Sequence, residues 1–262
     1  MTEQADYIEP VLHIKDENFD VDFIPQSDLI LEIGLSYFRF TAKHQNQYVL
    51  LEDYNYPADE FRESLLSKVF NQNIFLAARF WKSIKILIHT KKKTVVPAQI
   101  DDKRAEQIWK AMFGPTQKND LIQSHTIVDE QTLIYRVDKV IINFLREFYE
   151  GKEIEFLPVE INLIPPKTDM AYLLYDGIGY LFVSRKEMIN SYYSTNYNDL
   201  VQTHKPSLIK LVGEITKYSE SYKTLKLAGF NIEVTSSDSS LKTPLIFRNL
   251  PRHRYYSLVG NI

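Results

Sequence analysis

Two stretches of the chain repeat one pattern, and this repeat constrains the fold more than any other feature. Residues 29–40 and residues 172–183 align without gaps at an offset of 143. Four of the twelve aligned pairs are apolar in both copies without being identical, and three are identical: Leu31 with Leu174, Gly34 with Gly177, and Tyr37 with Tyr180. A repeat that is followed by the same order of elements indicates that one folding unit occurs twice.

The first half predicts a three-stranded meander and then alternating helices and strands. Apolar runs between polar turns predict strands at residues 29–33, 37–40, 48–51, 84–88, 94–96, 121–128 and 131–137. Pro57 and the acids after it suit the first turn of a helix. A second helix is expected to start at Asp101 and to stop at Gly114, and apolar residues at helical spacing predict a third from 137 to 148.

The second half repeats the opening meander. Asp176-Gly177 between two apolar runs is a strong hairpin signal. The pattern predicts strands at 170–175, 178–184, 188–193, 208–212 and 230–234, and helical segments from 196, over about 218–228 and near 252–259. Prolines between residues 157 and 167 mark the boundary between the halves. We therefore expect a polar leader (1–24), a first lobe (25–165) and a second, smaller lobe (166–262).

Composition excludes several classes of site and location. The chain has 262 residues and no cysteine, which removes disulfides, thiolate nucleophiles and cysteine-ligated metals. The first ten residues carry acids and no apolar run, so we expect no secretory signal. No apolar run approaches the roughly 18 residues that span a bilayer, and the net charge of −3 gives no general attraction to nucleic acid or anionic lipid. We expect a cytoplasmic protein without a membrane partner.

The order of three short motifs carries a family resemblance that covers about residues 25–262. The motifs are LEIGLS at 31–36, LIKLVGEI at 208–215 and LPRHRYYSL at 250–258. With them the chain resembles the actin, hexokinase and heat-shock-chaperone superfamily, and more narrowly it is similar to domain-of-unknown-function family 3822. The resemblance implies a duplicated ribonuclease-H-like, actin-like ATPase fold: an α/β protein of two lobes, each with a mixed sheet that a β-meander opens and helices flank.

The nucleotide residues that the superfamily implies are only partly present. Its Asp-x-Gly signature, which holds metal-bound water and lets backbone N–H groups approach phosphate, matches Glu32-Ile33-Gly34 in the first half. In the second half Gly177 matches, but a tyrosine, Tyr175, stands at the acid position. Of the paired glycines that contact adenosine, Gly213 remains and Glu214 replaces the other. The resemblance therefore implies a degenerate nucleotide site, with Gly34, Gly177 and Gly213 as the remaining binding positions.

Other candidate sites are weaker. The six histidines include no pair three or four residues apart, and the acids near residues 16–22 lack the glycine of a calcium loop, so we expect no metal site. Asp101-Asp102 is expected to cap a helix rather than to form a paired-carboxylate site. Arg248, Arg252 and Arg254 lie beside aromatic residues and are candidates for contact with an anion or a nucleic acid. A structural terminal helix is the preferred interpretation of this segment.

The leading hypothesis is a non-catalytic binding or scaffold protein on a degenerate ATPase fold, with an unidentified protein partner and no cofactor. One alternative is a divergent ATP-binding phosphotransferase or ATPase, in which Glu32 holds metal-bound water and ATP and magnesium are required. Another alternative is an RNA-associated accessory protein that uses Arg252 and Arg254.

Overall fold

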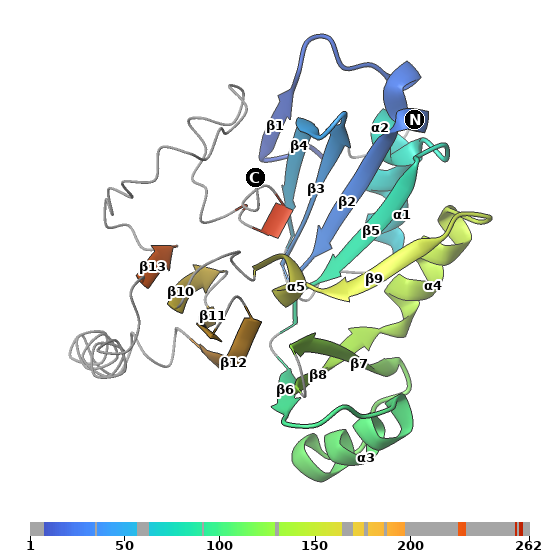
Figure 1. Cartoon of the computed structure of the whole chain (residues 1–262). Coiled ribbons are helices and arrows are strands. Elements are labelled where there is room, and N and C mark those ends of the chain that lie inside the picture. The colour runs from blue at the N-terminus through green and yellow to red at the C-terminus, as the bar shows by residue number, and fades with distance from the viewer. Residues whose placement is uncertain are drawn as a thin grey trace.

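The strands of the described chain form three sheets (Figure 1). The computed structural model describes residues 8–34, 36–56, 63–90, 92–128, 131–163, 170–175, 178–185, 188–196, 225–228, 255 and 257–258. No helix in this part of the chain is long and apolar enough to cross a membrane.

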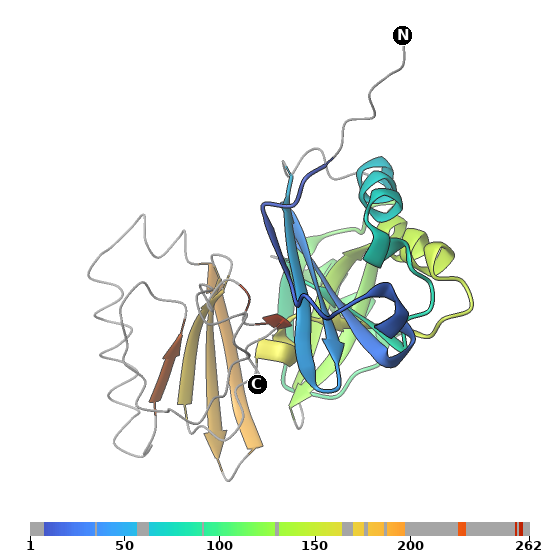
Figure 2. The same cartoon turned by 90° about the horizontal axis from the view of Figure 1, so that it is seen from above.

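The first sheet has the strand order β1-β4-β3-β2-β5-β9. Its strands are β1 (Leu12–Lys15), β2 (Ser27–Ile33), β3 (Tyr37–His44), β4 (Gln47–Asn55), β5 (Ser83–Ile88) and β9 (Ile154–Pro158). The pairs from β1 to β2 are antiparallel, whereas β2, β5 and β9 run parallel. The helices α1 (Glu63–Gln72), α2 (Ile74–Ala77) and α4 (Lys139–Phe148) cover one face of this sheet (Figure 2).

The main core lies between this sheet and its helices. All residues of β4 except its two ends are buried, because both faces of the strand are covered. From α4, Phe144 and Phe148 pack edge-on against Phe70 of α1, and Trp81 is fully buried with its Nε1 donating to the carbonyl oxygen of Phe75. This packing holds the ends of β2, β3 and β4 in fixed positions.

A second, smaller core lies under a three-stranded sheet. The order of this sheet is β6 (Lys93–Val96), β8 (Gln131–Asp138), β7 (Asp120–Val128), and α3 (Asp102–Phe113) packs on it. Its buried residues are Ala105, Trp109, Ile122 and Ile134. Asp101 accepts a hydrogen bond from the Arg104 N–H and Gly114 ends the helix at φ +84°, so the predicted capping role of Asp101 and the predicted helix end are confirmed.

The third sheet repeats the pairing of the central four strands of the first. Its order is β12 (Met188–Asn196), β11 (Ile178–Arg185), β10 (Met170–Tyr175), β13 (Leu225–Ala228), antiparallel twice and then parallel, as in β4-β3-β2-β5. The registers correspond as well. Tyr37 pairs with Asn55 and Glu32 with Leu87, and the pairs 141 residues later are Ile178 with Asn196 and Leu173 with Ala228.

The strand pairs of the two sheets correspond at an offset of 141 residues, two fewer than the offset of the sequence alignment. At an offset of 141, Tyr175 rather than Gly177 corresponds to Gly34, and Leu173 corresponds to Glu32. Side chains alternate between the faces of a strand with a period of two, so a shift of two keeps every apolar residue on the same face. The apolar pattern therefore matches at both offsets, and only the hydrogen-bond register distinguishes them.

Most predicted strands and helices of the first half are confirmed, but several elements of the chain differ from the prediction. Residues 225–228 form β13 instead of the end of a predicted helix, Val137 lies in β8 instead of starting α4, and β9 was not predicted. Residues 12–15 of the predicted leader form β1 at the sheet edge. The predicted helix start at residue 57 and the predicted strands at 208–212 and 230–234 lie outside the described residues.

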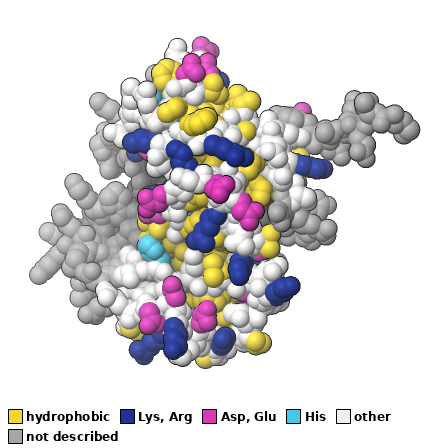
Figure 3. Space-filling view, turned by 90° about the vertical axis from the view of Figure 1, so that its right-hand side faces the viewer, with side chains coloured by type: hydrophobic (Ala, Val, Ile, Leu, Met, Phe, Trp, Pro, Cys, Tyr) yellow, Lys and Arg dark blue, Asp and Glu magenta, His cyan; other side chains and the backbone are white. Residues whose placement is uncertain are grey.

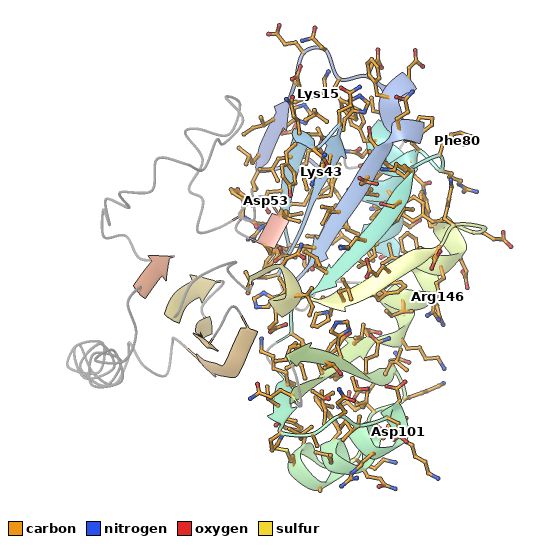
Figure 4. All side chains as sticks on the ribbon, viewed as in Figure 1. Lys15, Lys43, Asp53, Phe80, Asp101 and Arg146 are labelled. Atoms are coloured by element: carbon orange, nitrogen blue, oxygen red, sulfur yellow. The ribbon has the colours of Figure 1, made fainter. Side chains whose placement is uncertain are left out.

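Charged side chains of both signs are interspersed on the helix-bearing side of the molecule (Figure 3). Apolar side chains lie between them, and the most exposed large ones are Phe80, at 72%, and Ile74, at 64%. Phe80 follows α2 at the outer side of the fold (Figure 4). On the face shown in Figure 3, the described residues form no extended patch of one charge sign.

Candidate functional site

A buried polar cluster lies where β2, β3 and β4 meet the C-terminal end of the chain. We call it the Glu32 cluster, and its members are Glu32, Tyr37, Arg39, Asp53, His89, Tyr255 and Ser257. Glu32 and Asp53 are 0% exposed and Arg39 is 4% exposed. Ionised groups this deep are retained only where partners and hydrogen bonds offset their desolvation.

Strand register brings the three charged residues together. Glu32 lies directly opposite Arg39 in the β2–β3 pair, and Arg39 lies opposite Asp53 in the β3–β4 pair. Directly opposed residues point to the same face of a sheet. The three side chains therefore form one row across adjacent strands.

Both carboxylate oxygens of Glu32 accept hydrogen bonds from the protein itself. The Tyr37 hydroxyl donates to Oε1 at 2.5 Å, and the Ser257 hydroxyl donates to Oε2. Arg39 Nη1 is 3.9 Å from Oε1. The single hydroxyl hydrogen of Tyr37 is used in the bond to Glu32. In the 2.7 Å contact with His89, the Tyr37 oxygen therefore accepts the hydrogen bond and Nδ1 of His89 carries the proton. The hydrogen bond from His89 helps to hold the Tyr37 hydroxyl in place.

Asp53 joins Arg39 to the C-terminal residues. Arg39 Nε is 3.2 Å from Asp53 Oδ1, and the Tyr255 hydroxyl donates to Oδ2 at 3.0 Å. The guanidinium carbon of Arg39 lies 3.7 Å from the ring centre of Tyr37 and 5.4 Å from that of Tyr255, within the range of a cation–π contact. Figure 4 shows Asp53 beside the C-terminal helical segment.

Gly34 makes room for the ring of Tyr37. A Cβ at this position would lie 2.3 Å from Cε1 of Tyr37, far inside van der Waals contact. The Gly34 N–H donates to the carbonyl oxygen of Tyr37 at 3.0 Å. The Tyr56 hydroxyl is 2.7 Å from the Gly34 carbonyl oxygen and 2.8 Å from that of Tyr37, which closes the turn from the other side. The ring of Tyr37 fills the space next to the glycine backbone.

A second polar group, on Glu52, ties the edge strand and a helix to β4. Glu52 accepts hydrogen bonds from Tyr54 at 2.6 Å and from Asn73 Nδ2 at 2.6 Å, and it contacts His13 Nδ1 of β1 at 2.7 Å. Asn73 also caps α2 by accepting from the N–H groups of Phe75 and Leu76. This arrangement is structural, since each contact fixes an element against its neighbour.

Of the predicted site residues, the structure places Glu32 and Gly34 together at the end of β2. The other predicted glycines and arginines lie outside the described residues: Gly177, Gly213, Arg248, Arg252 and Arg254. Glu214 lies outside them as well. Within the described part of the chain, no three histidine or acidic side chains are grouped so that they could hold a metal ion.

Sequence reasoning missed Tyr37, Arg39, Asp53, Tyr255 and Ser257. A signal for Arg39 and Asp53 exists, because a charged residue inside an apolar strand pattern requires a buried partner. Arg39 and Asp53 both interrupt such patterns in β3 and β4. Tyr255 and Ser257 lie in the motif at 250–258, but nothing local indicates their contacts, because the acids that they contact are more than 200 residues away in the sequence.

Residues 16–165 match the model of a family described as "Protein of unknown function (DUF3822)". This match spans more than half of the chain. The protein belongs to the DUF3822 family. The predicted family resemblance is thereby confirmed. No curated protein matches the sequence of this DUF3822 protein.

Similarity to solved structures shows the fold. A Bacteroides thetaiotaomicron protein with an actin-like ATPase fold and unknown function matches at a TM-score of 0.62 and 16% identity, over 82% of this chain and 86% of that chain. The cytoplasmic domain of EpsL from the Vibrio cholerae type II secretion system matches at 0.42 and 9% identity, over 68% and 76%. A PilM–PilN type IV pilus biogenesis complex matches at 0.42 and 13% identity, over 77% and 81%. The Bacteroides protein supports the assignment: this DUF3822 protein has a mixed α/β fold of the actin-like ATPase type.

Proposed function

We propose that this DUF3822 protein is a non-catalytic binding or scaffold protein on a degenerate actin-like ATPase fold, and that it works without a bound nucleotide. One observation carries the proposal. The carboxylate of Glu32, which stands where the resemblance expects the acid that holds metal-bound water, is fully buried and has both oxygens engaged by hydroxyl groups of the chain. An unidentified protein partner and the predicted cytoplasmic location are part of this proposal.

The arrangement around Gly34 supports the same conclusion, because it does not fit a magnesium nucleotide. A phosphate at the hairpin needs open space beside the glycine and a free backbone N–H. Here the Tyr37 ring fills that space and the Gly34 N–H is bonded to a carbonyl oxygen. To admit a phosphate, Tyr37 would have to give up its bonds to Glu32 and His89 and its contact with Arg39.

We also propose that the two meanders are copies of one unit, and that the second copy has no acid at the position of Glu32. The shared strand order and the constant offset of 141 residues between their pairs support the duplication. At this offset Leu173 occupies the position of Glu32. An actin-like ATPase site built from both halves would therefore lack a carboxylate on the second side.

Calorimetric titration with ATP and ADP in the presence of magnesium tests the proposal, and thermal unfolding provides a second measurement. We expect no binding heat and no change in Tm. A ligand that binds only the folded state stabilises it by about 2.7 kcal/mol at one hundred times its Kd. Micromolar binding would therefore produce a measurable increase in Tm. Micromolar affinity that disappears in Glu32→Gln would instead support the divergent ATPase. The RNA hypothesis, which depends on Arg252 and Arg254, stays a prediction.

A further inference from the structure

The C-terminal residues of the described chain dock on the first sheet mainly through hydroxyl groups. We infer that the part of the Glu32 cluster on the first sheet is a binding site for this segment. This part, here called the receptor, consists of Glu32, Tyr37, Arg39, Asp53 and His89, and its ligand is the latch, which we define as Tyr255, Ser257 and Leu258. The chemical class of the ligand is a helical segment that presents tyrosine and serine hydroxyls two positions apart. The site that the ATPase fold uses for a nucleotide thus serves an intramolecular peptide.

The contacts of the latch join parts of the chain that are far apart in sequence. Ser257 donates to Glu32, Tyr255 donates to Asp53, and the Ser257 carbonyl oxygen accepts from Asn162 Nδ2 at 2.9 Å. Asn162 belongs to α5 (Glu160–Leu163), which lies with the latch between the first and third sheets (Figure 2). Leu258 is 1% exposed and packs in the main core. The latch is thus held by polar contacts from three elements, β2, β4 and α5, and by one apolar anchor.

Charge explains why the receptor selects hydroxyl donors. Its row of charged residues contains two acids and one arginine, all buried. A carboxylate only accepts hydrogen bonds, and each buried acceptor oxygen needs a donor. Two of these donors are the hydroxyls of Tyr255 and Ser257. A ligand that brought a carboxylate or a phosphate to this place would face repulsion in a region of low dielectric.

The third sheet indicates that the charges are not needed to build the meander. The pairs that correspond to Glu32–Arg39 and Arg39–Asp53 are Leu173–Tyr180 and Tyr180–Ser194, which contain no charged residue. Burying three ionised groups costs several kcal/mol that an uncharged row avoids. The charged row is therefore explained by what binds to it rather than by the fold.

Hydrogen exchange measured by mass spectrometry on the full chain tests the latch. In Ser257→Asp, the new carboxylate meets Glu32, and we expect exchange in peptides that contain residues 255–258 to accelerate at least tenfold. Peptides from α3 should keep the rate of the unmodified protein. Ser64→Asp, on an exposed position of α1, introduces the same charge away from the site and should leave the latch protected.

A second substitution distinguishes binding from general loss of structure. Glu32→Gln in the Ser257→Asp background removes the charge repulsion, so protection should return by at least threefold. Ser257→Asp could accelerate exchange across the whole chain by unfolding it. In that case the uncharged variant Tyr255→Phe/Ser257→Ala, which removes only the two hydroxyl donors, is measured instead. Faster exchange confined to residues 255–258 in this variant supports the inference. Unchanged protection of residues 255–258 in either variant overturns it. These readouts use no nucleotide and no partner, so the proposed function can fail without affecting the result.

Discussion

Tyr37 contacts several residues in and beside the first hairpin. Its hydroxyl bridges Glu32 and His89, its ring lies against the guanidinium of Arg39, and the same ring occupies the space that Gly34 leaves by lacking a Cβ. Any movement of the Tyr37 ring would break these contacts and would therefore cost free energy. The glycine is therefore required by a side chain of the same hairpin.

The substitution Gly34→Ala should destabilise the protein by about 2 kcal/mol, which is within the usual range for overpacking. The new Cβ would push the Tyr37 ring aside, so that its hydroxyl would lose its hydrogen bonds to Glu32 and His89. Urea unfolding measures the change in the free energy of unfolding.

The matched control is Gly34→Ala in a Tyr37→Ala background, where the space is open and the additional loss should be much smaller. Equal losses in both backgrounds would show that the glycine serves the backbone and not the ring.

At this scale the sequence identified two of the important residues. Glu32 and Gly34 stand out because they match a short local signature. Arg39 and Asp53 become meaningful only when strand register places them opposite each other. The contribution of Tyr255 and Ser257 depends on long-range docking, and no periodicity in the sequence contains that information.

The elements divide into those that local chemistry determines and those that it does not. The helix α3 begins and ends where Asp101 and Gly114 predict, because caps act within a few residues. Residues 225–228, in contrast, form a strand that pairs parallel with β10. A short apolar segment is compatible with a helix or a strand, and its pairing with a distant strand determines which of the two forms. The same limit applies to the repeated pattern, whose apolar residues match at offsets of 143 and of 141 alike.

Loss of the α3 cap should weaken the smaller core. Asp101→Ala removes the acceptor of the Arg104 N–H, and we expect a loss of about 1 kcal/mol in the free energy of unfolding. Urea unfolding followed by circular dichroism measures it.

The control is Asp101→Asn, which keeps a side-chain oxygen and should retain most of the stability. A loss as large as that of Asp101→Ala would mean that the charge of Asp101, rather than the cap, stabilises α3.

Over the whole molecule, the contacts between the sheets lie outside what the sequence predicts. The chain was expected to form an α/β fold of the actin-like type, and the solved Bacteroides structure supports that fold. The insertion of α5 and the latch between the first and third sheets was not expected (Figure 2). Such contacts depend on which surfaces remain uncovered once each sheet has formed, which a local pattern does not encode.

Acid should destabilise the protein through His125 of β7. Burial lowers the pKa of His125 below its ordinary value of 6.5, and Glu155 of β9 offsets only part of this effect. The unfolded chain therefore binds the proton at a higher pH than the folded chain does. Stability is full above pH 6.5 and falls as the pH drops from 6.5 toward the lowered pKa.

Urea unfolding across this pH range measures the dependence. In His125→Gln the part of the acid-induced loss that this histidine causes should disappear. An unchanged slope in His125→Gln would contradict the assignment.

The two tryptophans of the chain lie in different cores: Trp81 in the main core and Trp109 in the smaller one. Each packing unit thus contains its own fluorophore. Replacing either indole with phenylalanine leaves an emission signal that comes from one unit only. The optical properties of the native sequence therefore allow the melting of the two units to be followed separately, without any attached dye.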